Sequence, residues 1–165
     1  MNFIFREASI SDIDNLKQLG LDSYGQFENI LSKDNREKMY SFLNSEQSYL
    51  ELLSKSTCFI CEFEAKIVGM AYLISKGNPT EIFDKDWTYI RMVGVHPNFT
   101  GNGIGKKLTK MCIDFAKHQN ETVIALHTSE FMDSARHIYE NLGFQIAKEL
   151  NLNYGKKYWL YILYL

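Results

Sequence analysis

Glycines at every second position distinguish one segment of the sequence, residues 93–108. The segment reads Val-Gly-Val-His-Pro-Asn-Phe-Thr-Gly-Asn-Gly-Ile-Gly-Lys-Lys-Leu, and its alternating glycines are Gly101, Gly103 and Gly105. Glycine permits unusual backbone dihedrals and a close approach of a ligand. A turn of this kind that opens a helix presents several backbone N–H groups, and the helix N-terminus adds roughly half a positive charge. The segment therefore predicts a site for a phosphate or pyrophosphate group.

Two common phosphate-binding patterns do not fit this segment. A P-loop requires Gly-x-x-x-x-Gly-Lys-Ser/Thr, but alignment on Gly105 and Lys106 puts Thr100 at the first glycine position and Lys107 at the Ser/Thr position. The dinucleotide pattern Gly-x-Gly-x-x-Gly requires a third glycine where Lys106 stands. A nucleotide-binding enzyme that uses the turn in another way stays open, and competition of ATP or NAD for the site would test it.

The same segment resembles the coenzyme A signature of the GNAT superfamily of N-acetyltransferases. That signature is V-x-V-x-P, then Arg/Gln-x-x-Gly-x-Gly/Ala, then a helix. The sequence matches it at Val93, Val95, Pro97, Gly103 and Gly105. It departs from it at Thr100, where the family normally has Arg or Gln. Because backbone amides hold most of the phosphate in such turns, we expect this departure to weaken binding rather than abolish it.

A second block downstream is similar to another part of the family pattern, A-x-x-x-Y-x-x-x-G-F. Ala135, Tyr139, Gly143 and Phe144 match it. The family often has Asn seven residues before the tyrosine, and here that position is Met132, as in a variant found in some relatives. A single tyrosine on an apolar helix face is more often a core residue, but two blocks in the right order and spacing favour a functional role.

The resemblance implies transfer of an acetyl group from acetyl-CoA to a primary amine of a small molecule or peptide, with no metal. In the family the pantetheine arm fills a V-shaped split between strands four and five, and a strand-four N–H near Val93 faces the thioester oxygen. Tyr139 would protonate the departing thiolate as the general acid. The residues expected to bind the coenzyme are Met92, Val93, Gly94, Val95, Thr100, Gly101, Asn102, Gly103, Ile104, Gly105, Lys106, Met132 and Ala135.

The general base is left open by the sequence. Many relatives have an acidic residue on strand four, but Tyr89 to Met92 contains no carboxylate. His127, Glu130 and a chain of waters are the alternatives, although a histidine at the position of His127 is more often a strand residue with a satisfied hydrogen bond. His96 and His137 are interpreted as solvated surface residues. The missing carboxylate also leaves open a non-catalytic acyl-CoA-binding or regulatory module of the same fold.

The acceptor in this family usually lies between the first helices and the last two strands. The early helical region has a mild excess of acidic residues, which suits a cationic amine but is also typical of any solvated helix surface. Several aromatic residues in this region either wall an apolar pocket or simply pack in the core: Tyr24, Phe27, Tyr40, Phe42 and Tyr49.

The pattern of apolar residues predicts the elements that position these groups. Strands are expected at 3–8, 57–64, 66–75, 87–95, 122–128, 144–150 and 156–164. Helices are expected after Ser9 or Ser11, once or twice within 22–54, at 103–118 and at 132–142. This order predicts an α/β (α+β) fold with helices packed on a mixed sheet. The resemblance implies one GNAT domain over residues 1–165, with a mostly antiparallel sheet of about seven strands, helices on both faces and the V-shaped split.

The composition of the sequence argues against several other classes of protein. The 165 residues and 45% hydrophobic content suit one folded domain, and the formal net charge of −2 argues against nucleic-acid binding. No run of 18 apolar residues predicts a membrane span, and charges at Arg6 and Glu7 come too early for a secretory signal, so we expect a cytoplasmic protein.

Cys58 and Cys61 are interpreted as strand residues on opposite faces. The apolar, aromatic segment 156–165 is expected to form an exposed edge strand that pairs in a homodimer.

Overall fold

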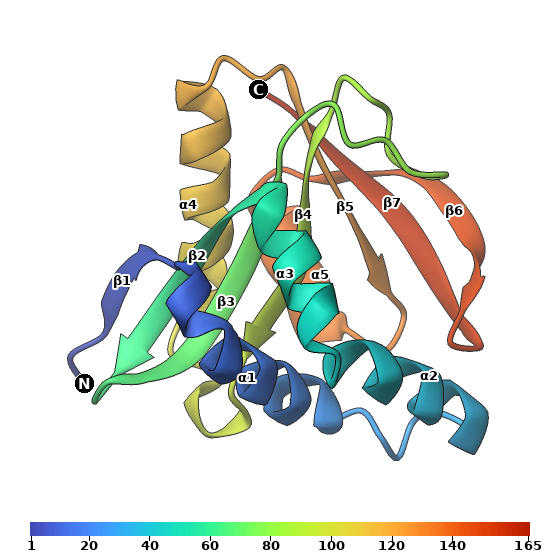
Figure 1. Cartoon of the computed structure of the whole chain (residues 1–165). Helices are drawn as coiled ribbons and strands as arrows, with labels where there is room; N and C mark the ends of the chain where they lie inside the picture. Colours follow the sequence, from blue (N-terminus) through green and yellow to red (C-terminus); the bar gives the residue numbers. More distant parts are fainter.

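Seven strands of the computed structural model, which describes residues 1–165, form one sheet in the order β1-β2-β3-β4-β5-β7-β6 (Figure 1). The strands are β1 (Ile4–Glu7), β2 (Ser56–Phe63), β3 (Lys66–Ile74), β4 (Thr88–Val95), β5 (Val123–Ser129), β6 (Gln145–Asn153) and β7 (Lys156–Tyr164). Only β4 and β5 are parallel, and every other neighbouring pair is antiparallel. The prediction of a mixed, mostly antiparallel sheet is therefore confirmed.

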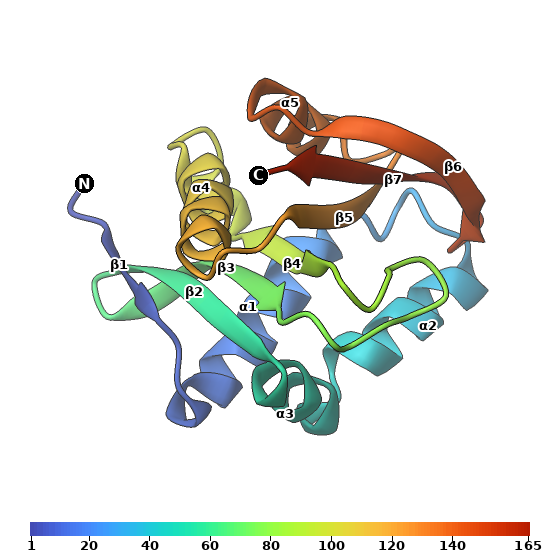
Figure 2. The same cartoon turned by 90° about the horizontal axis from the view of Figure 1, so that it is seen from above.

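Helices cover both faces of this sheet. They are α1 (Ile13–Gly25), α2 (Lys33–Leu43), α3 (Glu46–Ser54), α4 (Ile104–His118) and α5 (Asp133–Asn141). Figure 2 shows α4 and α5 on one side of the sheet and α1, α2 and α3 on the other. This agrees with the prediction of helices on both faces. Each face of the sheet is therefore covered by a different set of helices.

Local sequence explains where several of these elements begin. The Ser9 N–H donates to the Asp12 carboxylate at 2.8 Å in a capping box, so the first helical turn starts where the sequence indicated. The Ser32 and Ser45 hydroxyls accept from backbone N–H groups three residues later and cap α2 and α3. Glu64 and Ala65 both have positive φ, which is the geometry of a two-residue hairpin turn between β2 and β3.

Two apolar cores lie on opposite faces of the sheet. One core includes Cys61 and residues of α4, and the other includes Cys58 and residues of α1 and α3. The two cysteines therefore point to opposite faces, as predicted. Burial raises the pKa of the Cys58 thiol to about 12 and that of Cys61 to about 11, so both stay protonated at neutral pH. They act as small apolar core residues rather than as a redox pair.

The C-terminal strand β7 lies inside the sheet, and the prediction of an exposed edge strand was wrong. Strand β7 has antiparallel partners on both sides, β5 and β6. Its apolar residues Tyr158, Leu160 and Tyr161 are buried by the two neighbouring strands and the cores. The edges of the sheet are β1 and the largely exposed β6. The apolar character of 156–165 is thus explained within one chain, which removes the reason for expecting a dimer through it.

Candidate functional site

Strands β4 and β5 diverge after three paired residues, which confirms the expected V-shaped split. Pairing ends at Ile90 and Leu126, although β4 continues to Val95 and β5 to Ser129. Strand β4 stays paired with β3 as far as Val95, so only its other side loses a partner. Figure 1 shows the two strands separating below this point. We call this region, beyond Ile90 on β4 and Leu126 on β5, the β4–β5 split.

A β-bulge in β4 lies directly beside the split. The register with β3 shifts so that Tyr72 is paired with Arg91 and Met70 with Gly94, which leaves one extra residue in β4. Met92 has a φ of +52°, in the left-handed region that non-glycine residues seldom adopt. The bulge changes the direction of β4 at the point where its pairing with β5 ends.

The free side of β4 presents backbone hydrogen-bonding groups to the split. The His96 N–H donates to the Val68 carbonyl at 2.9 Å, so this residue points towards β3. Because neighbouring strand residues alternate, the backbone groups of Val95 and Val93 point away from β3 and towards the split. An extended ligand with amide groups could pair with this side as an added strand.

The glycine turn, residues 100–105, lies at the end of β4 that borders the split. Gly101 and Gly103 have φ of +81° and +74°, and at both positions an added Cβ would meet no atom within 4 Å. The first intrahelical hydrogen bond of α4 runs from the Lys107 N–H to the Gly103 carbonyl. The preceding N–H groups of α4 therefore have no helical partner, and its first turn contains no acidic residue. This is an exposed, open site with the chemistry to hold an anion.

The side chains of the glycine turn hold its shape. The Thr100 hydroxyl donates to the Pro97 carbonyl at 2.9 Å, and the Asn102 amide donates to the Phe99 carbonyl at 2.9 Å. Ile104 is buried in the core below, and Lys106 is exposed on the first turn of α4. Thr100 thus stabilises the turn, a role that differs from that of the long side chain normal at this position of the family.

Tyr139 on α5 belongs to the same core as Val93, Val95 and Ala135, on the α4–α5 face of the sheet. Its side chain is 6% exposed, and its ring is 6.0 Å from that of Phe144 in an edge-on arrangement. Burial raises the pKa of Tyr139, and no hydrogen bond contributes to this shift. The phenol therefore remains protonated at neutral pH and has no partner within the protein.

Two other predicted coenzyme residues have defined contacts. Met132 precedes α5, and its sulfur accepts from the Thr128 hydroxyl at 3.6 Å, which ties the end of β5 to the start of α5. Gly94 is buried, and a Cβ there would lie 2.8 Å from the Ser23 Oγ of α1. A side chain at residue 94 would thus collide with α1. Close packing on the face opposite to α4 therefore requires a glycine here.

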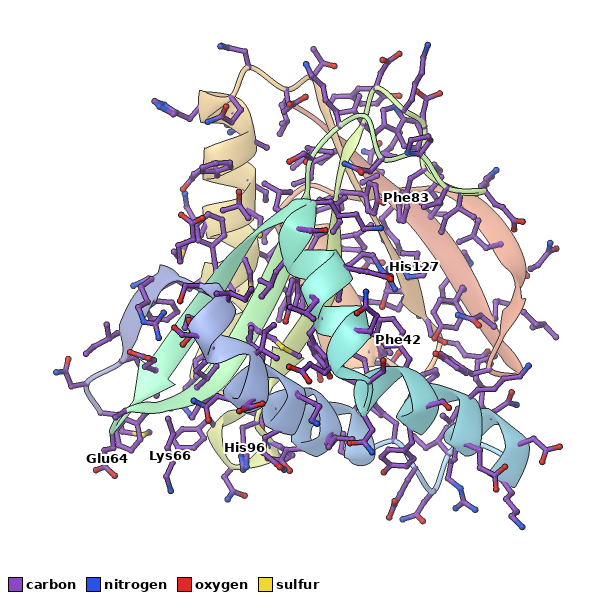
Figure 3. All side chains as sticks on the ribbon, viewed as in Figure 1. Phe42, Glu64, Lys66, Phe83, His96 and His127 are labelled. Carbon is purple, nitrogen blue, oxygen red and sulfur yellow. The ribbon has the colours of Figure 1, made fainter.

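The candidate bases lie on different surfaces. His127 on β5 is half-buried between the rings of Phe83, at 5.8 Å, and Tyr158, at 5.5 Å, and Figure 3 shows it beside Phe83. Burial, and to a lesser degree the charge of Arg91, lowers the pKa of His127 to about 4. Glu130 is exposed and accepts from the Lys157 N–H at 3.3 Å. The His127 ring packs against aromatic rings instead of making the hydrogen bond of the alternative interpretation.

Two other histidines, His96 and His137, lie elsewhere on the surface. His137 is exposed, as expected. His96 is partly buried, and its Nδ1 accepts from the Asn98 N–H at 3.2 Å, so it is part of the turn that follows β4. Sequence reasoning named Arg91 only as part of a stretch without a carboxylate. The structure places it next to the split, half-buried and over the ring of Phe42.

The structure contains no cluster of three or more metal-ligating side chains. None of its helices has both the length and the apolar character needed to cross a bilayer.

Comparisons with known proteins agree on one family. The sequence model of the acetyltransferase (GNAT) family matches residues 24–144. The chain is 32% identical over 123 residues to the probable N-acetyltransferase camello of Xenopus laevis, a match that covers 74% of this chain and 52% of the relative. The chain thus spans about half the length of the curated relatives it matches first.

Two solved structures share the fold at low sequence identity. The PaiA N-acetyltransferase of Thermoplasma acidophilum, in complex with coenzyme A, has a TM-score of 0.77 at 16% identity, covering 97% of this chain and 98% of that one. The putative acetyltransferase yncA of Salmonella typhimurium, with acetyl-CoA, has a TM-score of 0.71 at 18% identity, covering 100% and 95%.

Proposed function

Because the chain belongs to the GNAT acetyltransferase family, we propose that it transfers an acetyl group from acetyl-CoA to a primary amine of a small molecule or peptide. The observation that carries this proposal is the combination of the β4–β5 split with the open glycine turn at its border. A ligand with an anionic head and an extended amide-containing arm fits this combination.

In this proposal the backbone holds most of the coenzyme. The N–H groups of residues 101–106 bind the pyrophosphate at the N-terminus of α4, and the glycines allow it to approach closely. The free side of β4 around Met92, Val93 and Val95 pairs with the pantetheine arm. Met132 and Ala135 border the arm from the start of α5.

The acceptor amine then attacks the thioester carbon, so that a C–N bond forms and the carbonyl oxygen becomes an oxyanion. An N–H of β4 near Val93 stabilises this oxyanion. When the C–S bond breaks, Tyr139 gives its proton to the leaving thiolate. The buried, protonated and unpartnered phenol supports this role.

The proton of the acceptor amine leaves through water in this scheme. A histidine with a pKa of about 4 binds a proton too weakly at neutral pH to serve as an efficient base. Glu130 is exposed and engaged with the Lys157 N–H, so it is less suitable. No carboxylate on β4 replaces them.

The first test is calorimetric titration with acetyl-CoA, followed by a free-thiol assay over a panel of amines. We expect binding and amine-dependent thiol release. Tyr139→Phe should lower turnover roughly a hundredfold, the usual contribution of a positioned general acid, with little change in the acetyl-CoA affinity. An unchanged rate would remove Tyr139 from the mechanism.

A non-catalytic coenzyme-binding module is the second candidate, favoured by the absence of a carboxylate on β4 and by the internal hydrogen bond of Thr100. Saturable acetyl-CoA binding without thiol release over a broad amine panel would support it.

A further inference from the structure

A cation without an anionic partner lies at the split, on the face opposite to the glycine turn. Arg91 follows Ile90, the last residue of β4 that pairs with β5. Of the four arginines in the sequence, the other three donate hydrogen bonds from their guanidinium groups, and Arg91 donates none. None of the ion pairs in the structure includes Arg91.

Alternation along β4 defines the face on which Arg91 lies. Ile90 belongs to the core under α4, whereas Tyr89 and Met92 belong to the core under α1 and α3. Arg91 lies on the second of these faces, where its guanidinium carbon is 5.6 Å from the ring centroid of Phe42. An acceptor that enters the split from the α1–α3 face therefore meets Arg91.

The groups around Arg91 are aromatic and uncharged at neutral pH. Burial raises the pKa of Tyr24, Tyr89 and Tyr154 and lowers that of His127, and the nearby charge of Arg91 has a smaller, lowering effect on the pKa of all four; no carboxylate influences any of these four groups. Burial is the largest effect on each of them; it keeps the phenols protonated and the imidazole neutral. The positive charge of Arg91 is thus not compensated by any side chain that faces it.

This arrangement has the form of a binding site rather than of a structural ion pair. A half-buried guanidinium that lacks hydrogen bonds loses solvation without compensation. Its planar donors match a carboxylate, which they bind in a bidentate manner. A ligand carboxylate would restore both the charge balance and the hydrogen bonds.

Aromatic rings extend from this cation along the same face. Phe83 stacks on Tyr89 at 4.0 Å and meets His127 edge-on at 5.8 Å. Figure 3 places His127 between Phe83 and Phe42 in this view of the split. Phe83 and Tyr89 are buried, so the rings that can meet a ligand beside Arg91 are the partly exposed Phe42 and His127. They border a single positive charge, which differs from the mildly acidic acceptor region that was one interpretation of the sequence.

We propose that Arg91 binds the carboxylate of the acceptor, which is a free α-amino acid with an apolar or aromatic side chain. The side chain packs against the partly exposed rings of Phe42 and His127, and the α-amine points into the split. This inference rests on the proposed acetyltransferase function, because it names the acceptor of that reaction.

The test compares amino acids with the matching amino alcohols, which replace the carboxylate by a hydroxymethyl group. The pairs are phenylalanine and phenylalaninol, leucine and leucinol, and methionine and methioninol. The readouts are kcat/KM from thiol release and, independently of turnover, calorimetric affinity for the CoA-saturated protein. We expect the wild type to prefer at least one acid over its alcohol by roughly ten- to a hundredfold, the usual effect of a charge-assisted hydrogen-bond pair.

Arg91→Met should abolish this preference, and Arg91→Lys should keep only part of it because an ammonium lacks the bidentate donors. Arg36→Met is the matched control, since it removes the same charge from α2 and should leave the preference unchanged. Thermal unfolding checks that all variants fold. An alcohol preference in the wild type, or an acid preference that survives Arg91→Met, would overturn the inference.

The outcomes also separate this inference from the proposed function. If other amines release thiol and no amino acid is preferred, the acceptor class is wrong and the acetyltransferase function stands. If no amine releases thiol but phenylalanine binds in a manner that depends on Arg91, the carboxylate site stands and the catalytic function fails.

Discussion

Gly103 and Gly77 allow the phosphate site to be tested against an internal control. Both have positive φ, +74° and +88°, and both have open space where a Cβ would be added. Gly103 lies in the glycine turn, whereas Gly77 lies in the loop after β3. Alanine in this conformation costs about 1 kcal/mol of unfolding free energy at either position. The two substitutions should therefore lower the unfolding free energy by similar amounts, and only the one at Gly103 lies in the proposed phosphate site.

Only Gly103→Ala should also reduce the acetyl-CoA affinity. A methyl group at the surface of the turn, or a backbone that leaves the left-handed region, removes at least one N–H contact to the phosphate. Hydrogen bonds to charged groups contribute about 1.5–3 kcal/mol, so the Kd for acetyl-CoA should rise roughly ten- to a hundredfold. Gly77→Ala should leave the Kd unchanged.

Calorimetric titration gives the Kd, and denaturant unfolding gives the stability of the same samples. If the two variants lose similar stability and bind acetyl-CoA equally well, the turn does not hold the phosphate and the assignment of the coenzyme site is refuted.

Two further predictions concern neighbouring residues. Gly105→Ala should raise the unfolding free energy by about 0.5–1 kcal/mol, because alanine loses less backbone entropy than glycine in a helix. The new Cβ would fit without a clash, with ordinary contacts at 3.5 Å to Ile138 and 3.7 Å to Val95. Denaturant unfolding measures the change, and a loss of stability would contradict the prediction. The pKa of His127 in the folded protein is about 4, below the usual 6.5. The unfolded chain therefore binds the proton more readily than the folded protein does. As a result, the free energy of unfolding falls as the pH drops below 6.5. The wild type should lose about 2 kcal/mol between pH 7 and 5 through this group, and His127→Gln should lose correspondingly less in the same unfolding assay; equal losses would contradict the assigned pKa.

The order of helices and strands was predictable because each carries its own local signal. Seven apolar runs and the helical spacing in 103–118 agree with the observed elements within a few residues. The glycine turn was predictable for the same reason, since alternate glycines have few structural explanations. The split itself came from the family resemblance, because no residue of β4 or β5 indicates by its type where pairing stops.

Features that depend on distant partners were not predictable. Met92 has a positive φ although methionine has no preference for that region, so the bulge is imposed by the pairing of β4 with β3. The position of β7 between β5 and β6 is set by tertiary pairing, and an apolar strand next to its hairpin partner looks the same at an edge. The isolation of Arg91 is visible only once its surroundings are known to lack carboxylates.

The two faces of the split differ in a way that suits two anionic substrates. The α4–α5 face offers backbone N–H groups at the glycine turn, and the α1–α3 face offers one guanidinium within aromatic rings. On the proposals above, each face binds one anionic group, the coenzyme phosphates on the first and the acceptor carboxylate on the second. If one cation bound both groups, the coenzyme phosphates and the acceptor carboxylate would lie close together on the same face of the sheet and repel each other. Separate sites instead direct the two uncharged reacting groups, the thioester and the free amine, towards each other through the split.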